Sequence, residues 1–153
     1  MPSRRMSLLL CATLVLFASL LAACGSPSTM KLAGNAMLPN FHDGQVVNVQ
    51  TVSASDLRRF DVVIFKKEGI TNMKRLIGMP GDTVTIQDGQ VFINGAVLDE
   101  PYDVSGSTQA QGTSAYTLGT DEFFVLGDNR EHSTDSRMFG PVLASEITKR
   151  VVS

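Results

Sequence analysis

Cysteine and histidine are scarce in this sequence. It contains two of each among 153 residues, and both cysteines, Cys11 and Cys24, lie within or at the end of an apolar N-terminal segment. The remaining chain therefore has no disulfide and no thiolate metal site. His42 and His132 are far apart in the sequence, and no other ligand-type pattern supports them. We therefore expect no metal site and no cofactor.

Clustered positive charge is also missing. The formal net charge is −2, and two of the positive charges, Arg4 and Arg5, belong to the N-terminal segment, which leaves the rest of the chain near −4. Nucleic-acid binding needs a clustered basic surface that neutralises phosphates. Nucleic acid is therefore excluded as a partner. The length suits one domain, and a hydrophobic content of 43% is enough for a core.

The N-terminal segment is organised like an export signal. Residues 1–6 are short and basic, and residues 8–23 are apolar without a charge, which is typical of a secretory signal. Small residues precede Cys24, and this end resembles the lipobox of bacterial lipoproteins, in which the cysteine sulfur takes a diacylglyceryl group. The alternative is an uncleaved anchor, although the apolar run is shorter than the roughly 20 residues of a usual span. Both interpretations place the protein on the cell membrane, at its extracytoplasmic face.

The sequence divides into a signal segment at 1–23, a linker at 24–33 and one folded domain at 34–153. Runs of β-branched and aromatic residues in this domain predict short strands. Asp88 and Gly89 predict a two-residue hairpin turn, because they accept positive φ angles. A polar segment at 103–117 predicts a long exposed loop. The predicted strands are 45–49, 61–65, 73–77, 83–87, 90–94 and 122–126. Short strands with tight turns predict an all-β barrel or sandwich.

Two segments at the end of the domain have less regular patterns. Residues 127–140 are dense in polar side chains and predict no strand, and residues 144–147 predict one helical turn.

Four segments carry residues that a scaffold alone does not need: 34–39, 59–65, 74–82 and 127–140. Together they resemble the bacterial type I signal peptidases, which are serine–lysine leader peptidases. The resemblance covers residues 34–142 and keeps the family's order of segments. It implies a strongly coiled β-domain with an apolar surface against the bilayer. It also implies cleavage of leader peptides from exported proteins.

The resemblance assigns roles to individual residues. Lys74 matches the family's general base, and Ser133 matches a hydroxyl that orients this lysine. Asp135 and Arg137 match a charged pair that braces the site, while Gly127 and Asn129 shape the loop around it. A lysine base must be neutral to accept a proton, and burial in apolar surroundings favours the neutral form.

The sequence departs from the family at the nucleophile. The family's loop has serine where this chain has Ala36, and threonine where it has Asn40. Alanine has no attacking atom, so Ala36 predicts weak or no peptidase activity. The backbone N–H of Ala36 remains available for an oxyanion hole.

Three interpretations of this departure follow. One is a signal peptidase-like protein with impaired catalysis that binds leader peptides or a protein partner. The second is an active peptidase, in which either Ala36 was introduced to trap substrate or a different nucleophile serves. The third is a non-catalytic, lipid-anchored scaffolding pseudo-peptidase.

Overall fold

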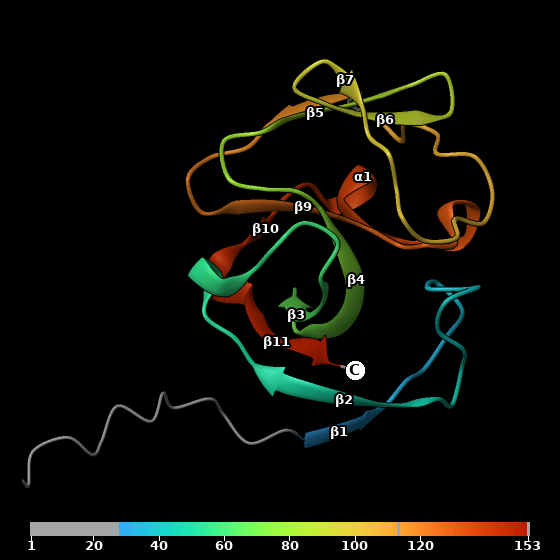
Figure 1. Ribbon diagram of the computed structural model, residues 1–153, viewed down its shortest axis with the longest axis vertical. Helices are drawn as coiled ribbons and strands as arrows, with labels where there is room; N and C mark the ends of the chain where they lie inside the picture. The colour runs from blue at the N-terminus through green and yellow to red at the C-terminus, as the bar shows by residue number, and fades with distance from the viewer. Residues whose placement is uncertain (1–27, 113, 153) are drawn as a thin grey trace, which may run out of the picture.

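The computed structural model describes residues 28–112 and 114–152 as a mostly β protein, which confirms the predicted fold class. One sheet has seven strands in the order β1-β2-β11-β3-β4-β9-β10, and a second has four in the order β7-β6-β5-β8. In Figure 1, the four-stranded sheet lies at the top, with β9 and α1 between it and the other strands. The strands are β1 (Ser28–Lys31), β2 (Val46–Thr51), β3 (Val62–Lys67), β4 (Ile70–Gly78), β5 (Thr83–Gln87), β6 (Gln90–Ile93), β7 (Ala96–Val97), β8 (Ala115–Thr117), β9 (Glu122–Leu126), β10 (Val142–Leu143) and β11 (Ile147–Val152).

Helical segments are short. The α-helix α1 (Ser136–Phe139) and the 3-10 helices η1 (Ala54–Asp56), η2 (Arg130–His132) and η3 (Ala144–Glu146) are single turns. In the described part of the chain, no helix is long and apolar enough to cross a membrane. The signal segment, Cys11 and Cys24 lie outside the described residues.

Each predicted strand has a counterpart in the structure, and the hairpin at Asp88 and Gly89 is confirmed. Both residues have positive φ, at 51° and 79°, and Gln87 pairs directly with Gln90 across the turn. This backbone is the one that a type I′ turn requires. The 3-10 turn η3 corresponds to the helical turn expected at 144–147.

Three expectations need correction. The end of the predicted linker forms strand β1, because residues 28–31 pair with β2. The predicted loop at 103–117 ends in strand β8, which pairs with β5. The irregular segment 127–140 contains η2 and α1. Strands β1 and β8 are short, and pairing with distant strands rather than local sequence pattern holds them in place. The turns η2 and α1 are closed by backbone hydrogen bonds between near neighbours, such as Met138 N–H to the Asp135 carbonyl oxygen.

Strand β9 connects two parts of the core. Phe123 and Val125 pack into a cluster with residues of β3, β4 and β11, while Phe124 and Leu126 pack into a cluster with residues of β5 and β6. Successive side chains of a strand point to opposite faces, so one buried strand serves both clusters. A third cluster joins β2 and β3 through Val47, Val49 and Ile64.

Candidate active site

Lys74 lies in the middle of β4, opposite Val63 of β3, and is 6% exposed. Its Nζ donates a hydrogen bond to the carbonyl oxygen of Met73 at 3.1 Å. Burial lowers the pKa of this amine below its ordinary value of 10.5, and the carboxylate of Asp135 opposes that effect more weakly. The neutral amine that a general base requires is therefore favoured by the surroundings of Lys74.

Ala36 lies in a turn that follows β1. Its carbonyl oxygen accepts a hydrogen bond from the backbone N–H of Asn129 at 3.0 Å. The side chain of Asn129 donates to the carbonyl oxygen of Asn35 at 3.1 Å. Gly34, at the start of this turn, has a φ of 90°, a conformation that favours glycine. Asn129 thus joins the loop carrying Ala36 to the segment after β9.

Ser133 and Gly127 meet at the same loop. A Cβ on Gly127 would stand 2.2 Å from Ser133 Oγ and 2.5 Å from the Ala36 carbonyl oxygen. Only glycine fits at position 127, because both distances are far below van der Waals contact. Among the described residues, Ser133 Oγ is buried and has no hydrogen-bond partner. The hydrogen bond expected between Ser133 and Lys74 is therefore absent from this structure.

Asp135 and Arg137 form the ion pair that the sequence predicts. Arg137 Nε donates to Asp135 Oδ1 and Nη2 donates to Oδ2, both at 2.8 Å. The Asp135 carboxylate also accepts the backbone N–H of Gly127 at 3.0 Å. The Arg137 guanidinium donates to the carbonyl oxygen of Arg130 at 2.7 Å. Both residues are almost fully buried, at 0% and 2% exposed, so the pair holds the segment 127–137 together.

A second buried ion pair was not predicted as part of the site. Arg75 Nε donates to Asp128 Oδ1 at 2.8 Å, and its guanidinium carbon lies 3.9 Å from the ring centroid of Tyr102. Asn40 Nδ2 donates to Asp128 Oδ2 at 2.9 Å and to the carbonyl oxygen of Asp103 at 2.7 Å. The position where the family has threonine therefore connects the Ala36 loop to Asp128.

Arg130 is a further buried residue that sequence reasoning missed. It is 1% exposed, and it pairs with Glu100, contacts Thr108 and donates to the carbonyl oxygen of Gly127 at 3.0 Å. A signal for Arg130 and Asp128 was present, since both lie within the matched segment 127–140. Their partners come from distant parts of the chain, and no local pattern indicates them.

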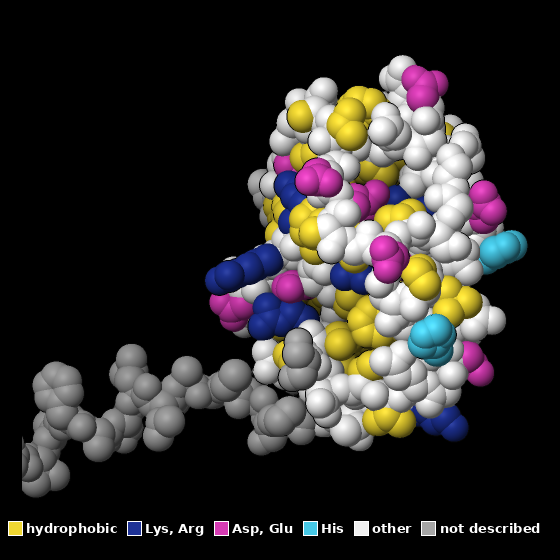
Figure 2. Space-filling view, turned by 45° about the vertical axis from the view of Figure 1, so that its right-hand side comes forward, with side chains coloured by type: hydrophobic (Ala, Val, Ile, Leu, Met, Phe, Trp, Pro, Cys, Tyr) yellow, Lys and Arg dark blue, Asp and Glu magenta, His cyan; other side chains and the backbone are white. Residues whose placement is uncertain are grey.

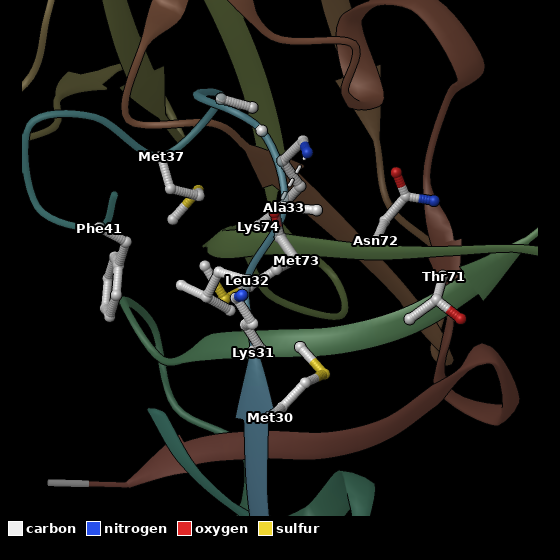
Figure 3. A pocket seen from close by; sticks show the side chains of 12 residues that line it. Met30, Lys31, Leu32, Ala33, Met37, Phe41, Thr71, Asn72, Met73 and Lys74 are labelled. Carbon is white, nitrogen blue, oxygen red and sulfur yellow. Dashed lines mark hydrogen bonds between the residues drawn. The ribbon is translucent and has the colours of Figure 1, made fainter. Parts of the chain in front are cut away.

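Ala36 and Lys74 both line a pocket of about 300 Å³. In Figure 3, the Lys74 side chain extends toward Ala33, while Leu32, Met37, Met73 and Phe41 supply apolar surface. The pocket is lined by Met30, Lys31, Leu32, Ala33, Gly34, Ala36, Met37, Phe41, Thr71, Asn72, Met73 and Lys74.

Both walls of this pocket are strand edges without a neighbour on one side. Strand β1 pairs with β2 alone in the described structure. Strand β4 pairs with β9 only from Arg75 onward, so residues 70–74 have β3 as their single strand neighbour there. An extended peptide placed between the walls would find backbone hydrogen-bonding groups on both sides.

The arrangement holds a buried amine and an alanine in one pocket, without a hydroxyl on Ala36 for the amine to activate. Among the sequence-predicted residues, the structure brings Ala36, Gly127, Asn129 and Ser133 together by direct contact. Lys74 shares a pocket with Ala36, and Asp135 influences its pKa.

A model of a known protein family matches almost the whole chain. Residues 4–153 match the family model described as signal peptidase, peptidase S26. The chain is 37% identical over 115 residues to signal peptidase I of Bacillus amyloliquefaciens, an alignment covering 68% of this chain and 62% of the relative. It is 34% identical over 132 residues to signal peptidase I V of Bacillus subtilis, covering 76% of this chain and 79% of the relative. The first alignment thus leaves more than a third of that relative unmatched.

A solved structure is also similar. The crystal structure of a signal peptidase I from Enterococcus faecalis superposes with a TM-score of 0.51 at 32% sequence identity. The similarity covers 64% of this chain and 97% of the solved one. The sequence and the fold are therefore both similar to those of signal peptidases I.

Proposed function

We propose, from the premise that the chain belongs to the signal peptidase family S26, that it binds leader peptides of exported proteins. We further propose that the chain cleaves these peptides weakly or not at all, because Ala36 has no hydroxyl. Cleavage of leader peptides is the family's activity, and this chain keeps the pocket for that substrate. Its substrate class is an extended peptide with small side chains near the scissile bond.

The pocket between Ala36 and Lys74 carries this proposal. One wall is formed by the end of β1 and the segment after it, and the other by the first half of β4. A bound peptide would add a strand between these edges and place its backbone beside Lys74. The apolar side chains of Met37, Phe41 and Leu32 narrow the space for substrate side chains.

The site lacks the hydroxyl oxygen that would attack the peptide bond. Lys74 can act as a general base because burial lowers its pKa, but Ala36 has no hydroxyl to deprotonate. Removing the nucleophile of a serine protease lowers turnover by about 10⁶, and about 10³–10⁴ over water remains from binding and the oxyanion hole. Such a residual rate is too low for general processing of exported proteins.

The test is cleavage of a leader-peptide substrate by the full chain in detergent, as it stands and as Ala36→Ser. We expect the serine variant to cut with a rate at least about 10³ above the parent chain. The hydroxyl would stand in the pocket that Lys74 lines. The matched control is Ala36→Ser combined with Lys74→Met, which keeps the hydroxyl, removes the base and is expected to be inactive.

Efficient cleavage by the parent chain would overturn the assignment of impaired activity. A failure of both the parent and Ala36→Ser to bind the peptide, measured by fluorescence anisotropy, would overturn the assignment of substrate.

A further inference from the structure

The amine of Lys74 has an unusual set of neighbours for a lysine. It is buried, and its Nζ donates to a carbonyl oxygen, that of Met73. In the part of the chain that the structure describes, no carboxylate lies within ion-pair distance of it and no group donates a hydrogen bond to it. Its lone pair is therefore not engaged by a described neighbour.

The pocket around this amine offers apolar surface and enough space for a small molecule. Ala36 contributes a methyl group, and Leu32, Met37 and Met73 supply further apolar surface. The volume of about 300 Å³ is at the lower end of the range for small-molecule sites. A serine at position 36 would place a hydroxyl in this space, whereas alanine places a methyl group there.

A neutral lysine amine in an apolar pocket is a nucleophile toward carbonyl groups. We propose that Lys74 is a covalent binding site for small apolar aldehydes, which it captures as an imine. The nitrogen lone pair attacks the carbonyl carbon to give a carbinolamine. Loss of one water molecule then forms the C=N double bond, with the carbonyl oxygen leaving as that water, and no oxidant or reductant is involved. The lowered pKa of Lys74 supports this chemistry, since only the neutral amine reacts.

Other lysines of the described chain have different surroundings. Lys67 donates to Glu146 Oε2 and to the carbonyl oxygen of Pro141, both at 3.1 Å. Lys31 lines the same pocket as Lys74 but is exposed, and Lys66 is also exposed. Lys149 donates to Ser28 Oγ at 3.1 Å. Lys74 is therefore the side chain expected to react selectively.

The experiment treats the full chain in detergent with hexanal and cyanoborohydride at pH 7. The hydride reduces the imine to a stable secondary amine, which adds a fixed mass to the modified residue. Peptide mapping by mass spectrometry then locates the label and separates Lys74 from the chain's terminal amine. We expect labelling of Lys74 to exceed that of each exposed lysine by at least about tenfold, in line with the larger neutral fraction.

Two variants sharpen the result. Lys74→Met should lose the selective label, whereas Lys67→Met should keep it unchanged. Even if Lys74→Met does not fold, the map of the parent chain decides the question. A label spread evenly over exposed lysines, with Lys74 unmodified, would overturn the proposal. Labelling requires no leader peptide, so its outcome is independent of the peptidase assay.

Discussion

At the scale of one residue, Lys74 is a buried amine that shares its pocket with the methyl group of Ala36. Its charged form is disfavoured by burial, and two charged groups face it: the carboxylate of Asp135, which favours the charge, and Lys31, which lines the same pocket. Burying an amine costs folding free energy, so a buried amine is usually retained where a function needs it. In a serine–lysine site that function is to take a proton from the serine hydroxyl. In this chain the amine is still buried, but position 36 has no hydroxyl that could give it a proton.

The pH dependence of stability follows from the direction of the Lys74 shift. The folded chain binds this proton less tightly than the unfolded chain does, because the folded pKa is lowered from 10.5. The resulting destabilisation is full below the folded pKa and disappears as the pH approaches 10.5. We expect Lys74→Met to raise the free energy of unfolding at pH 7, because the folded chain no longer has to bury a charged amine. The gain should fade toward pH 10.5, as measured by urea denaturation across the pH range.

A Lys74→Met variant that is less stable than the parent at pH 7 would contradict this prediction. It would mean that the packing of the lysine side chain outweighs the cost of burying its amine. The control is Lys66→Met, which removes an exposed lysine from the neighbouring strand and should change stability by less than about 0.5 kcal/mol at any pH.

At the scale of elements, the segment between β9 and β10 is held by one carboxylate. Asp135 caps the single turn of α1 by accepting the backbone N–H of Arg137 at 3.3 Å, and it also accepts the N–H of Gly127. Ser136 Oγ accepts the N–H of Val125, which attaches α1 to β9. A one-turn helix has little stability of its own. These contacts therefore place Ser133 and Asn129 against the Ala36 loop.

The ion pair between Asp135 and Arg137 should be costly to break. Arg137→Leu leaves the Asp135 carboxylate buried without its partner, and we expect a loss of about 3–5 kcal/mol in the free energy of unfolding. The control is Lys67→Met, which breaks a pair with Glu146 whose side chains are 22% and 23% exposed. That pair should contribute only about 0–1 kcal/mol. Chemical denaturation of both variants makes the comparison.

Combining Arg137→Leu with Asp135→Asn should recover part of the loss, because no buried charge is then unpaired. Equal losses for the single Arg137 and Lys67 variants would show that the buried pair does not hold the segment.

For the molecule as a whole, the order of strands leaves a gap between two strand edges, those of β1 and β4, and the candidate site lies in this gap. The seven-stranded sheet curls until the end of β1 and the first half of β4 line one pocket, although they belong to distant positions in the sheet. The face in Figure 2 shows hydrophobic side chains exposed between charged ones, with the two histidines lying apart. The proposed substrate would lie as an additional strand in the gap between β1 and β4.

Anchoring is also a property of the whole molecule, and it rests on Cys24. We propose that the mature protein begins at a diacylated Cys24, which would hold the domain at the outer face of the membrane. Cys24→Ala should then leave the precursor unprocessed, as judged by intact-mass analysis of the membrane fraction. A parent chain with an unmodified Met1 start would rule out the lipoprotein interpretation and favour an uncleaved anchor. The control is Cys11→Ala, which should not affect processing.

Much of the fold could be predicted from the sequence, because the signals are local. Runs such as 61–65 and 122–126 predict buried strands through β-branched and aromatic side chains, and Asp88 and Gly89 predict their turn through positive φ angles. The sequence alone establishes that the side chain at position 36 has no hydroxyl. The segments 74–82 and 127–140 identified the family. All of these depend on residues adjacent in the chain.

Tertiary structure alone decided the features that depend on distant contacts. Strand β1 forms within an expected linker because β2 supplies its hydrogen bonds. Ser133 has no described partner, and Asn40 contacts Asp128, because loops from opposite ends of the chain meet around Gly127. The lowered pKa of Lys74 comes from burial that neighbouring strands create. Which residue types are present is a property of sequence, whereas their partners and solvent exposure follow from how the sheet curls.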